Sequence, residues 1–490
     1  MKRIVVVGGG ITGLATAHAL AGAAPKNVEL VLLEASARLG GNLRTDHQEG
    51  FVIDGGPDSW VVSKPHASAF ARALGLGAEL VPTVEANRRV YIAWNGALHP
   101  LPEGLVLAVP TRIEPMVRTH LFSLAGKARM ALEPFVQARA WEGDEDESIS
   151  DFITRRLGAE CAERLAAPLL GGIFAGDATR ISVRAAFPQF VDAERRHGSL
   201  IVAMREERAA RASASGATDG GKAPSAFVSL RQGMGRLVEA AVQAVEGRVR
   251  IQREQPVTAV EKMRTATGDG YRLLLSGGEV LEANAVVVTA PAHQAARLVT
   301  PLDAPAGRLL EAIPFVSTAT AFYAFRRDDV QHPLDATGFL VPKPLGRRIL
   351  AVTWVTSKWA GRAPDGHVLM RVFFGGEAGE AILERDDAEL LRIGHDELRE
   401  LMGLTAEPLF GRVYRFHRAS PQPLVGHLTR MRALRERLSA RLPGLWVAGG
   451  GVFGIGVPEC VRQGQEVAAQ ALAHVAGSPA ERADPRAAAP

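Results

Sequence analysis

Glycines near the start of the chain have the spacing that lets a backbone approach a phosphate group. Residues 8–13 read Gly-Gly-Gly-Ile-Thr-Gly and match the pattern G-x-G-x-x-G. In that pattern the first glycine allows a tight turn, the second admits a pyrophosphate, and the third lets a helix pack against a strand. Glu34 lies about 20 residues further on, where an acid binds a ribose hydroxyl. These features predict a dinucleotide site formed by Gly8, Gly9, Gly10, Ile11, Thr12, Gly13 and Glu34.

Three local elements must position these residues. The β-branched run at 3–7 and the apolar run at 28–33 predict two strands, and the Ala/Leu-rich segment 11–23 predicts a helix between them. Such a strand–helix–strand unit is parallel, and the helix N-terminus faces the bound anion. An acid at the end of the second strand favours an adenosine ribose without a 2′-phosphate.

Composition narrows the class of protein. The chain has 490 residues, is 47% hydrophobic and 22% charged, and carries a net charge of +4, which is typical of a soluble globular protein with two or three domains. The charges form no basic block, so we expect no nucleic-acid partner. Cys161 and Cys460 are the only cysteines, and the histidines lack metal-ligand spacing, so we expect a cytoplasmic protein without a metal site.

Local patterns predict helices over residues 66–80 and 386–402 and a hairpin turn at Asn95 and Gly96. A strand–glycine–helix pattern near each end of the chain, with strands and helices between, predicts a nucleotide-binding domain built from distant segments. The expected fold class is α/β with α+β: a Rossmann-like domain, an inserted substrate domain with an antiparallel sheet and helices, and a helical subdomain. The expected limits are 1–87, 227–300 and 410–476 for the nucleotide-binding domain, 88–109 and 301–409 for the substrate domain, 110–210 for the helical subdomain, 211–226 for a flexible loop and 477–490 for a disordered tail.

Four further segments resemble those of FAD-binding, amine-oxidase-like flavoproteins. These are residues 34–42, with an arginine and a Gly-Gly pair, residues 51–59, residues 256–261 and the glycine cluster of residues 445–457. The resemblance implies that FAD is the cofactor and that backbone amides near Gly456 stabilise the reduced flavin. Beyond the first motif, it assigns FAD contacts to Ala35, Arg38, Gly41, Asn42, Gly56, Pro57, Asp58, Ser59, Val257, Ile455, Gly456 and Val457.

Narrower motifs resemble the protoporphyrinogen and coproporphyrinogen oxidase family, from about residue 3 to 475. They include Gly-Ile-Phe-Ala-Gly-Asp at 172–177, Gly-Phe-Leu-Val-Pro at 338–342 and Val-Pro-Glu-Cys-Val at 457–461. The resemblance implies that FAD and molecular oxygen remove six electrons from a porphyrinogen and that hydrogen peroxide is released. Since the flavin carries the redox step in this family, we expect no catalytic acid–base residue.

The resemblance also implies how a porphyrinogen is held. Such a substrate is a large apolar disc with carboxylate arms, so its site should be apolar with a cation at the rim. Arg88 matches the family's carboxylate-binding arginine, although Arg89 beside it leaves that assignment open by one residue. The ring contacts are assigned to Gly172, Phe339, Leu340 and Phe373, and the choice between the two porphyrinogens stays open.

Alternative functions share the fold. A flavin amine oxidase usually has a lysine on the strand matching residues 317–325, which contain none, and a carotenoid desaturase lacks the 172–177 segment. A flavin-holding scaffold is the alternative that is not an enzyme. Arg205, Arg208 and Arg211 are typical of a solvated face and could also contact anionic lipid at the inner face of the cell membrane, since peripheral attachment is common in the family. The oligomeric state stays open, a homodimer included.

Overall fold

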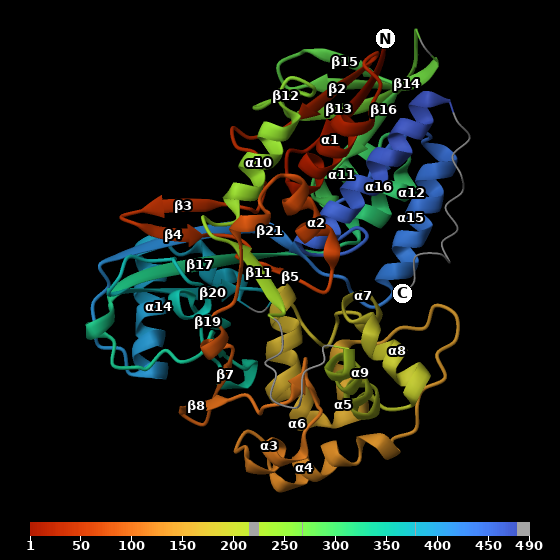
Figure 1. Cartoon of the computed structure of the whole chain (residues 1–490). Coiled ribbons are helices and arrows are strands. Elements are labelled where there is room, and N and C mark those ends of the chain that lie inside the picture. The colour runs from red at the N-terminus through yellow and green to blue at the C-terminus, as the bar shows by residue number, and fades with distance from the viewer. Residues whose placement is uncertain (215–224, 267, 378, 478–490) are drawn as a thin grey trace.

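The computed structural model describes residues 1–214, 225–266, 268–377 and 379–477. Figure 1 shows three bodies: a parallel sheet with its helices at the top, a second sheet at the left and a group of helices at the bottom. Most of the expected flexible loop and nearly all of the expected tail lie outside the described residues. Residues 211–214 are instead the last turn of α9 (Leu200–Ala214).

The parallel sheet confirms the Rossmann-like prediction. Its strand order places β1 in the middle, flanked by β2 and β16, with parallel register Val5 to Val31 and Val5 to Val286. Because both faces are covered, every side chain from Ile4 to Val7 is buried. The strands in spatial order are β12 (Arg250–Gln252), β2 (Val28–Leu33), β1 (Lys2–Val7), β16 (Ala285–Val288) and β22 (Leu445–Val447).

Helices cover both faces of this sheet. One face packs against α1 (Ile11–Ala23), α2 (Pro65–Ala73), α10 (Gly235–Val245) and α16 (Val457–Ala476). The other face packs against α11 (Ala292–Val299), α12 (Ala304–Glu311), α15 (His427–Arg441) and the small antiparallel sheet of β13 (Val257–Thr265), β14 (Gly268–Leu275) and β15 (Val280–Ala283). Segments from the two ends of the chain therefore form one domain, as expected.

The second sheet has seven strands and carries the inserted part of the chain. All neighbouring strands are antiparallel except β18 and β7. In spatial order they are β21 (Phe410–Pro421), β17 (Phe315–Arg326), β20 (His367–Gly375), β19 (Ala351–Trp354), β18 (Gly338–Leu340), β7 (Tyr91–Trp94) and β8 (Ala97–Pro100). The predicted turn at Asn95 and Gly96 joins β7 to β8, with positive φ at both residues. Helix α14 (Asp387–Met402) packs on one face.

Two expected limits differ from the structure. Residues 410–421 were expected in the nucleotide-binding domain, but they form β21 and pair with β17, because the chain completes the second sheet before it returns to the first. The helix expected over residues 66–80 ends at Ala73, because Gly75 adopts a left-handed φ of 80° and its N–H bonds to the Arg72 carbonyl. Short strands β6 (Leu80–Pro82), β5 (Trp60–Val61) and β11 (Phe227–Leu230) form a separate sheet nearby.

The helical body surrounds a buried ion-pair network. Its elements are α3 (Ile113–Arg118), α4 (Leu124–Ala131), α5 (Ile149–Leu157), α6 (Ala159–Cys161), a π-helix over Ala162–Gly171, α7 (Val183–Ala186), α8 (Pro188–His197) and α9. The Arg156 guanidinium is fully buried and pairs with Glu133 and, at 3.3 Å, with Glu194. Glu133 in turn accepts backbone N–H bonds from Leu200 and Ile201 at the start of α9. These bonds join three separate segments of the subdomain.

Replacing Arg156 by Met should destabilise the protein by about 3–5 kcal/mol, because a buried carboxylate at Glu133 would lose its cation. Urea unfolding followed by tryptophan fluorescence would measure the loss of unfolding free energy. Trp141 reports on this region, because its indole donates to Glu194. The control is Arg118→Met, which removes an exposed i,i+4 pair with Glu114 and should cost at most about 0.5 kcal/mol. Equal effects of the two substitutions would contradict a structural role of the buried network.

Candidate functional site

The glycine turn after β1 is fixed by close contacts between backbones. Gly8 has a φ of 114°, which disfavours any side chain. A Cβ on Gly13 would overlap the Gly8 carbonyl, and a Cβ on Gly9 would overlap the Leu39 side chain. The Thr289 hydroxyl donates to the Gly8 carbonyl at 2.8 Å, which ties the turn to the end of β16. Gly8 and Gly13 are therefore required by the protein's own backbone packing, whereas the atom closest to a Cβ on Gly9 belongs to the flexible Leu39 side chain.

Gly10 differs, because a Cβ there would meet no atom of the described chain within 4 Å. Gly10 is the N-cap of helix α1, which has no side-chain cap and no acid in its first turn, so the first N–H groups of the helix are available to an anion. The Gly41 backbone lies close to this turn, because a Cβ built on Gly41 would be 3.3 Å from the Gly10 Cα. The turn and the Gly40–Gly41 loop thus form a backbone-lined cradle that fits a pyrophosphate.

Arg38 holds this loop in place. Its guanidinium donates to the carbonyls of Leu39 at 3.0 Å, Leu43 at 2.8 Å and Gly41. Burial lowers the pKa of Arg38, and the neighbouring Arg44 adds to that effect. In this structure the contribution of Arg38 to the cradle is to shape the backbone around Gly41.

Glu34 and Val257 are brought together on the other side of the cradle. The Glu34 carboxylate accepts from the Gly9 N–H at 2.7 Å and from the Ser36 N–H at 2.8 Å. The Glu34 backbone bonds to Gln252 and Gln255. Val257, the first residue of β13, comes two residues after Gln255 and is thereby held near Glu34. This geometry fits the predicted ribose and adenine end of a dinucleotide. Ala35 stands between Glu34 and Ser36, which are joined by the hydrogen bond described above.

The segment 55–59 leads from the cradle to the second sheet. A Cβ on Gly56 would overlap the Asn42 carbonyl, so these two backbones touch. The Gly55 carbonyl accepts bonds from the Thr320 hydroxyl and from the Arg371 guanidinium, both at 3.0 Å. The cradle, the 55–59 segment and one face of the seven-stranded sheet are therefore continuous.

Five charged groups, here called the charge cluster, lie between this segment and the sheet: Asp54, Arg362 and Arg371, which are buried, and Asp58 and Lys358, which are partly buried. Asp58 pairs with Lys358 at 2.8 Å and accepts from the Trp359 indole at 3.0 Å. Burial alone would raise the pKa of Asp58, but Lys358 and Arg371 outweigh it and hold that pKa well below its usual range. Asp58 is thus a fixed anion that orients the segment, and Pro57 beside it is exposed.

The closing glycine segment meets α1 from the opposite end of the chain. The Gly449 N–H donates to the Gln463 side chain at 3.0 Å, and the Val452 carbonyl contacts the buried His427 ring at 3.1 Å. Helix α16 begins after Gly456 and crosses α1 at Gly464, where a Cβ would lie 2.5 Å from the Thr12 carbonyl. The start of α1 therefore packs against the first turns of α16.

The predicted ring contacts divide between two faces of the sheet. Leu340 and Phe373 both lie opposite Ala351, so their side chains share a face with Thr320 and Arg371. Phe339 lies on the other face, is 1% exposed and packs against Trp354, because successive side chains of a strand alternate. The structure therefore places Phe339 on the face opposite Leu340, and its contact with the ring stays a prediction.

Gly172 and Arg88 lie at the borders of that face. The loop at 172–176 contacts the ends of β20 and β21, through the Glu377 N–H to the Ala175 carbonyl and the Gln422 amide to the Phe174 carbonyl. A Cβ on Gly172 would meet no described atom within 4 Å, so open space lies before it. Arg88 is half-buried ahead of β7, whereas the Arg89 side chain is 62% exposed and lies 3.9 Å from Asp335. This contrast favours Arg88 as the inward cation.

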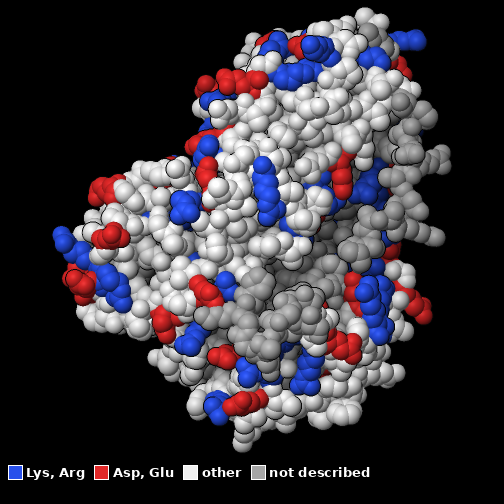
Figure 2. Space-filling view, in the orientation of Figure 1, with Lys and Arg blue, Asp and Glu red and all other residues white. Residues whose placement is uncertain are grey.

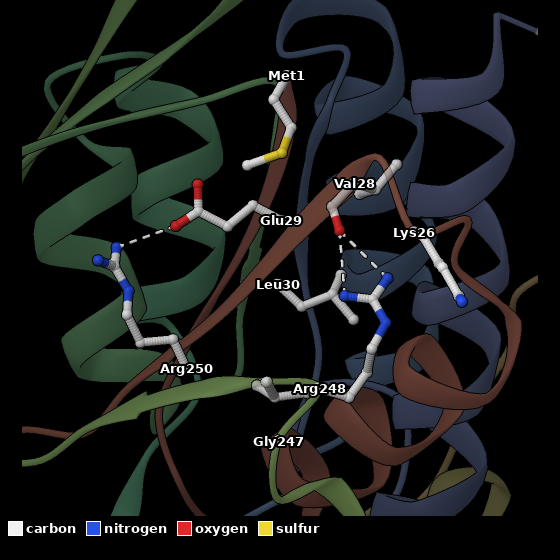
Figure 3. Close-up of a pocket in the computed structure, with 9 residues that line it drawn as sticks. Met1, Lys26, Val28, Glu29, Leu30, Gly247, Arg248 and Arg250 are labelled. Carbon is white, nitrogen blue, oxygen red and sulfur yellow. Dashed lines mark hydrogen bonds and ion pairs between the residues drawn. The ribbon is translucent and has the colours of Figure 1, made fainter.

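A recess at the amino end of the parallel strands is a separate feature (Figure 3). It is lined by Met1, Lys26, Glu29, Arg248 and Arg250, and the Arg248 guanidinium donates to the Val28 carbonyl at 3.1 Å. Arg250 pairs with Glu29 at 3.3 Å. Since ligands of such folds bind at the carboxyl ends of the strands, this recess is a structural joint between β2 and the β12 segment.

Sequence reasoning missed several residues of the site. Lys358 and Trp359 follow β19, and no local pattern indicates that their partner is Asp58, 300 positions earlier. Arg362 is also far in sequence from its partner Asp54, and Arg371 is far from Gly55, whose carbonyl it binds. Thr289 directly follows strand β16, and its bond to Gly8 depends on the pairing of β1 with β16.

The family model that matches the chain is described as flavin containing amine oxidoreductase and covers residues 11–472. A coproporphyrinogen III oxidase from Bacillus subtilis is 36% identical over 97% of this chain and 98% of its own length. The chloroplastic protoporphyrinogen oxidase 1 from Arabidopsis thaliana is 29% identical over 95% of this chain and 87% of its own length.

Solved structures agree with these matches. A crystal structure described as a "Putative protoporphyrinogen oxidase" from Exiguobacterium has a TM-score of 0.83 and 32% identity, and it covers 96% of this chain and 98% of the other. A reduced UDP-galactopyranose mutase shares the fold, with a TM-score of 0.69 and 17% identity over 98% of this chain and 97% of its own. The match to flavoproteins and the geometry of the cradle agree on FAD as the cofactor.

Replacing Gly10 by Val should weaken FAD binding at least tenfold without destabilising the apoprotein. The Cβ of the added side chain would point into the cradle, where it meets no described atom within 4 Å. Titration of the apoprotein with FAD, followed by quenching of flavin fluorescence, would measure the loss. Gly22→Val is the matched control, because Gly22 lies on the same helix and also faces open space, so its FAD affinity should stay within twofold. Unchanged affinity in Gly10→Val would contradict the cradle.

Proposed function

The chain belongs to the family of flavin-containing amine oxidoreductases, and we propose that it oxidises a porphyrinogen to the corresponding porphyrin with FAD. The proposed reaction removes six electrons from coproporphyrinogen III or protoporphyrinogen IX, as a step in haem biosynthesis, with molecular oxygen as the final acceptor and hydrogen peroxide as the product. The observation that carries the proposal is the match to named porphyrinogen oxidases over nearly the whole chain.

The apolar face beside the cradle supports a large flat substrate. Bound FAD would accept two electrons and a proton as hydride at each of three rounds of oxidation. Leu340 and Phe373 would contact the ring face, and Gly172 would leave room for it where a side chain would intrude. Packing of the ring between these surfaces would orient its reacting carbon and exclude water. The pyrrole protons would pass to solvent, so the mechanism needs no catalytic acid–base residue.

Of the two porphyrinogens, we favour coproporphyrinogen III. The relative that is 36% identical is named for that substrate, whereas the plant protein named for protoporphyrinogen is 29% identical. The test offers each porphyrinogen separately to the flavin-loaded protein and follows porphyrin fluorescence, oxygen uptake and peroxide. Three molecules of peroxide should form per porphyrin, since six electrons leave in pairs. A flavin that stays oxidised with both porphyrinogens would contradict the proposal.

Arg88→Ala should raise the KM for the porphyrinogen about tenfold or more, because a charged hydrogen bond to a substrate carboxylate would be lost. The kcat should change far less, since the arm lies away from the reacting carbon. Arg89→Ala is the control, and its KM should stay within twofold, because its side chain is turned outward toward Asp335. A larger effect of Arg89→Ala would reassign the carboxylate contact.

A peripheral contact with the membrane is part of the proposal, but at a different surface from the predicted basic cluster. Arg205 and Arg208 both donate to Thr111 and so are engaged within the subdomain, and the Arg211 side chain lies outside the described residues. Exposed apolar side chains gather instead on and after α3 and α4, at the bottom of Figure 1: Ile113, Val117, Leu124, Leu132 and Phe135. Within the described residues, no helix combines the length and apolar character needed to cross a bilayer. Residence in the cytoplasm and a homodimer stay predictions.

The double variant Leu124→Asp, Phe135→Asp should reduce flotation with phosphatidylglycerol vesicles at least fivefold. Both side chains are more than four-fifths exposed, at 85% and 84%, so the changes should leave stability within about 0.5 kcal/mol. Val280→Asp, at an exposed position on β15, is the control and should float like the unchanged protein. Figure 2 shows acidic and basic side chains interspersed over the face in view. Flotation that persists in the double variant would contradict this surface.

A further inference from the structure

The charge cluster between the 55–59 segment and the second sheet holds more cations than carboxylates. Arg362 pairs with Asp54 at 3.0 Å, and Lys358 pairs with Asp58 at 2.8 Å. Arg371 is the fifth member and has no carboxylate of its own within ion-pair distance among the described residues. Burial raises the pKa of Asp54, so the negative charge available to the cluster is at most two units. The cluster therefore carries excess positive charge.

Arg371 is buried in surroundings that do not neutralise it. It is 6% exposed, and its guanidinium lies over the Phe373 ring at 4.4 Å and the Phe322 ring at 5.4 Å. Its Nε is buried and has no hydrogen-bond partner in the described chain. Burial lowers the pKa of Arg371, but a guanidinium remains protonated in proteins. A buried cation with so few partners is costly and calls for a function.

Satisfying the Gly55 carbonyl does not require this charge. That carbonyl already accepts a bond from the Thr320 hydroxyl at 3.0 Å, which a neutral side chain supplies. Arg371 is also not placed to bind a carboxylate of a bound substrate, because the Gly55 backbone and two aromatic rings cover its guanidinium. Its charge must act at a distance, through an interior where screening is weak.

The nearest ligand site that such a charge can influence is the flavin end of the cradle. Gly10 faces Gly41, Asn42 touches Gly56, and Gly55 binds Arg371, so consecutive contacts join the pyrophosphate site to the cluster. Glu34 and Val257 occupy the opposite side of the cradle and take the adenosine. The remaining half of an extended dinucleotide therefore lies on the side of the 55–59 segment and its cluster.

We propose that Arg371 provides the fixed positive charge that favours reduction of the flavin. Two-electron reduction with uptake of one proton leaves the flavin with one negative charge, which a nearby buried cation stabilises relative to the neutral oxidised form. The assignment rests on the flavin site of the proposed function, but it does not depend on which substrate the protein oxidises. Arg371 acts here as an electrostatic residue without contact to substrate.

The test is the midpoint potential of the bound flavin, measured by dithionite titration against a reference dye without any porphyrinogen. Arg371→Met removes the charge and keeps the length, and it should lower the equilibrium constant for two-electron reduction about tenfold, which corresponds to about 30 mV. Arg371→Lys retains the charge, so its equilibrium constant for two-electron reduction should stay within threefold of that of the unchanged protein. A failure of porphyrinogen oxidation would leave this measurement intact, so the two proposals can fail separately.

Arg412→Met is the matched control. Arg412 and Arg371 both lie opposite Phe322 on the same face of the sheet, but Arg412 is more exposed and pairs with Asp46 at 3.0 Å. Its removal should therefore leave the equilibrium constant for flavin reduction within twofold of the unchanged protein. If Arg371→Met does not fold, Lys358→Met removes another cation of the cluster and should lower the potential in the same direction. An unchanged potential in the folded Arg371→Met protein, or equal shifts in the Met and Lys variants, would overturn the proposal.

Discussion

The structure depends on backbones that approach each other without side chains between them. Gly13 packs against the Gly8 carbonyl, Gly41 faces Gly10, Gly56 touches Asn42, and Gly464 packs on Thr12. Each contact joins segments that are separate in sequence, and together they bring β1, the 40–43 loop, the 55–59 segment and α16 around one site. A Cβ at most of these positions would force the segments apart, so the cofactor site and the packing of the domain rest on the same constraint.

The second sheet contributes a surface to this site. Its inward face presents Leu340 and Phe373 for an apolar ligand, and Thr320 and Arg371 for the 55–59 backbone. The opposite face carries Phe339 and Trp354 into the core beneath α14. Because strand side chains alternate, one sheet can be a rigid wall for a substrate and a packed interior at the same time. The helical body adds the loop at 172–176, so three parts of the chain border the proposed substrate site.

Buried charges play two different parts in this protein. In the helical body, the carboxylates of Glu133 and Glu194 are matched by two arginines, since Arg156 pairs with both and Arg155 also pairs with Glu194. Together with backbone bonds such as that from the Leu200 N–H to Glu133, these pairs hold the helices together. In the charge cluster, Arg371 exceeds the carboxylates that could balance it. A matched network stabilises a structure, whereas an unmatched charge acts on whatever binds nearby. The difference separates structural ionic groups from those that serve the flavin.

The sequence by itself determined the local features that have short-range causes. The first strand–helix–strand unit, the hairpin turn at Asn95 and the helix at 387–402 follow from periodicity, glycine positions and capping residues within a few positions of one another. The glycine pattern and Glu34 likewise predicted the dinucleotide site, since their spacing is fixed by one βαβ unit. Only the tertiary structure decided which face of the second sheet carries Leu340 and which carries Phe339, and that β21 joins this sheet. It also decided that Lys358 and Arg371 bind the 55–59 segment. These outcomes depend on strand register and on contacts between residues hundreds of positions apart, which no local pattern of side chains encodes.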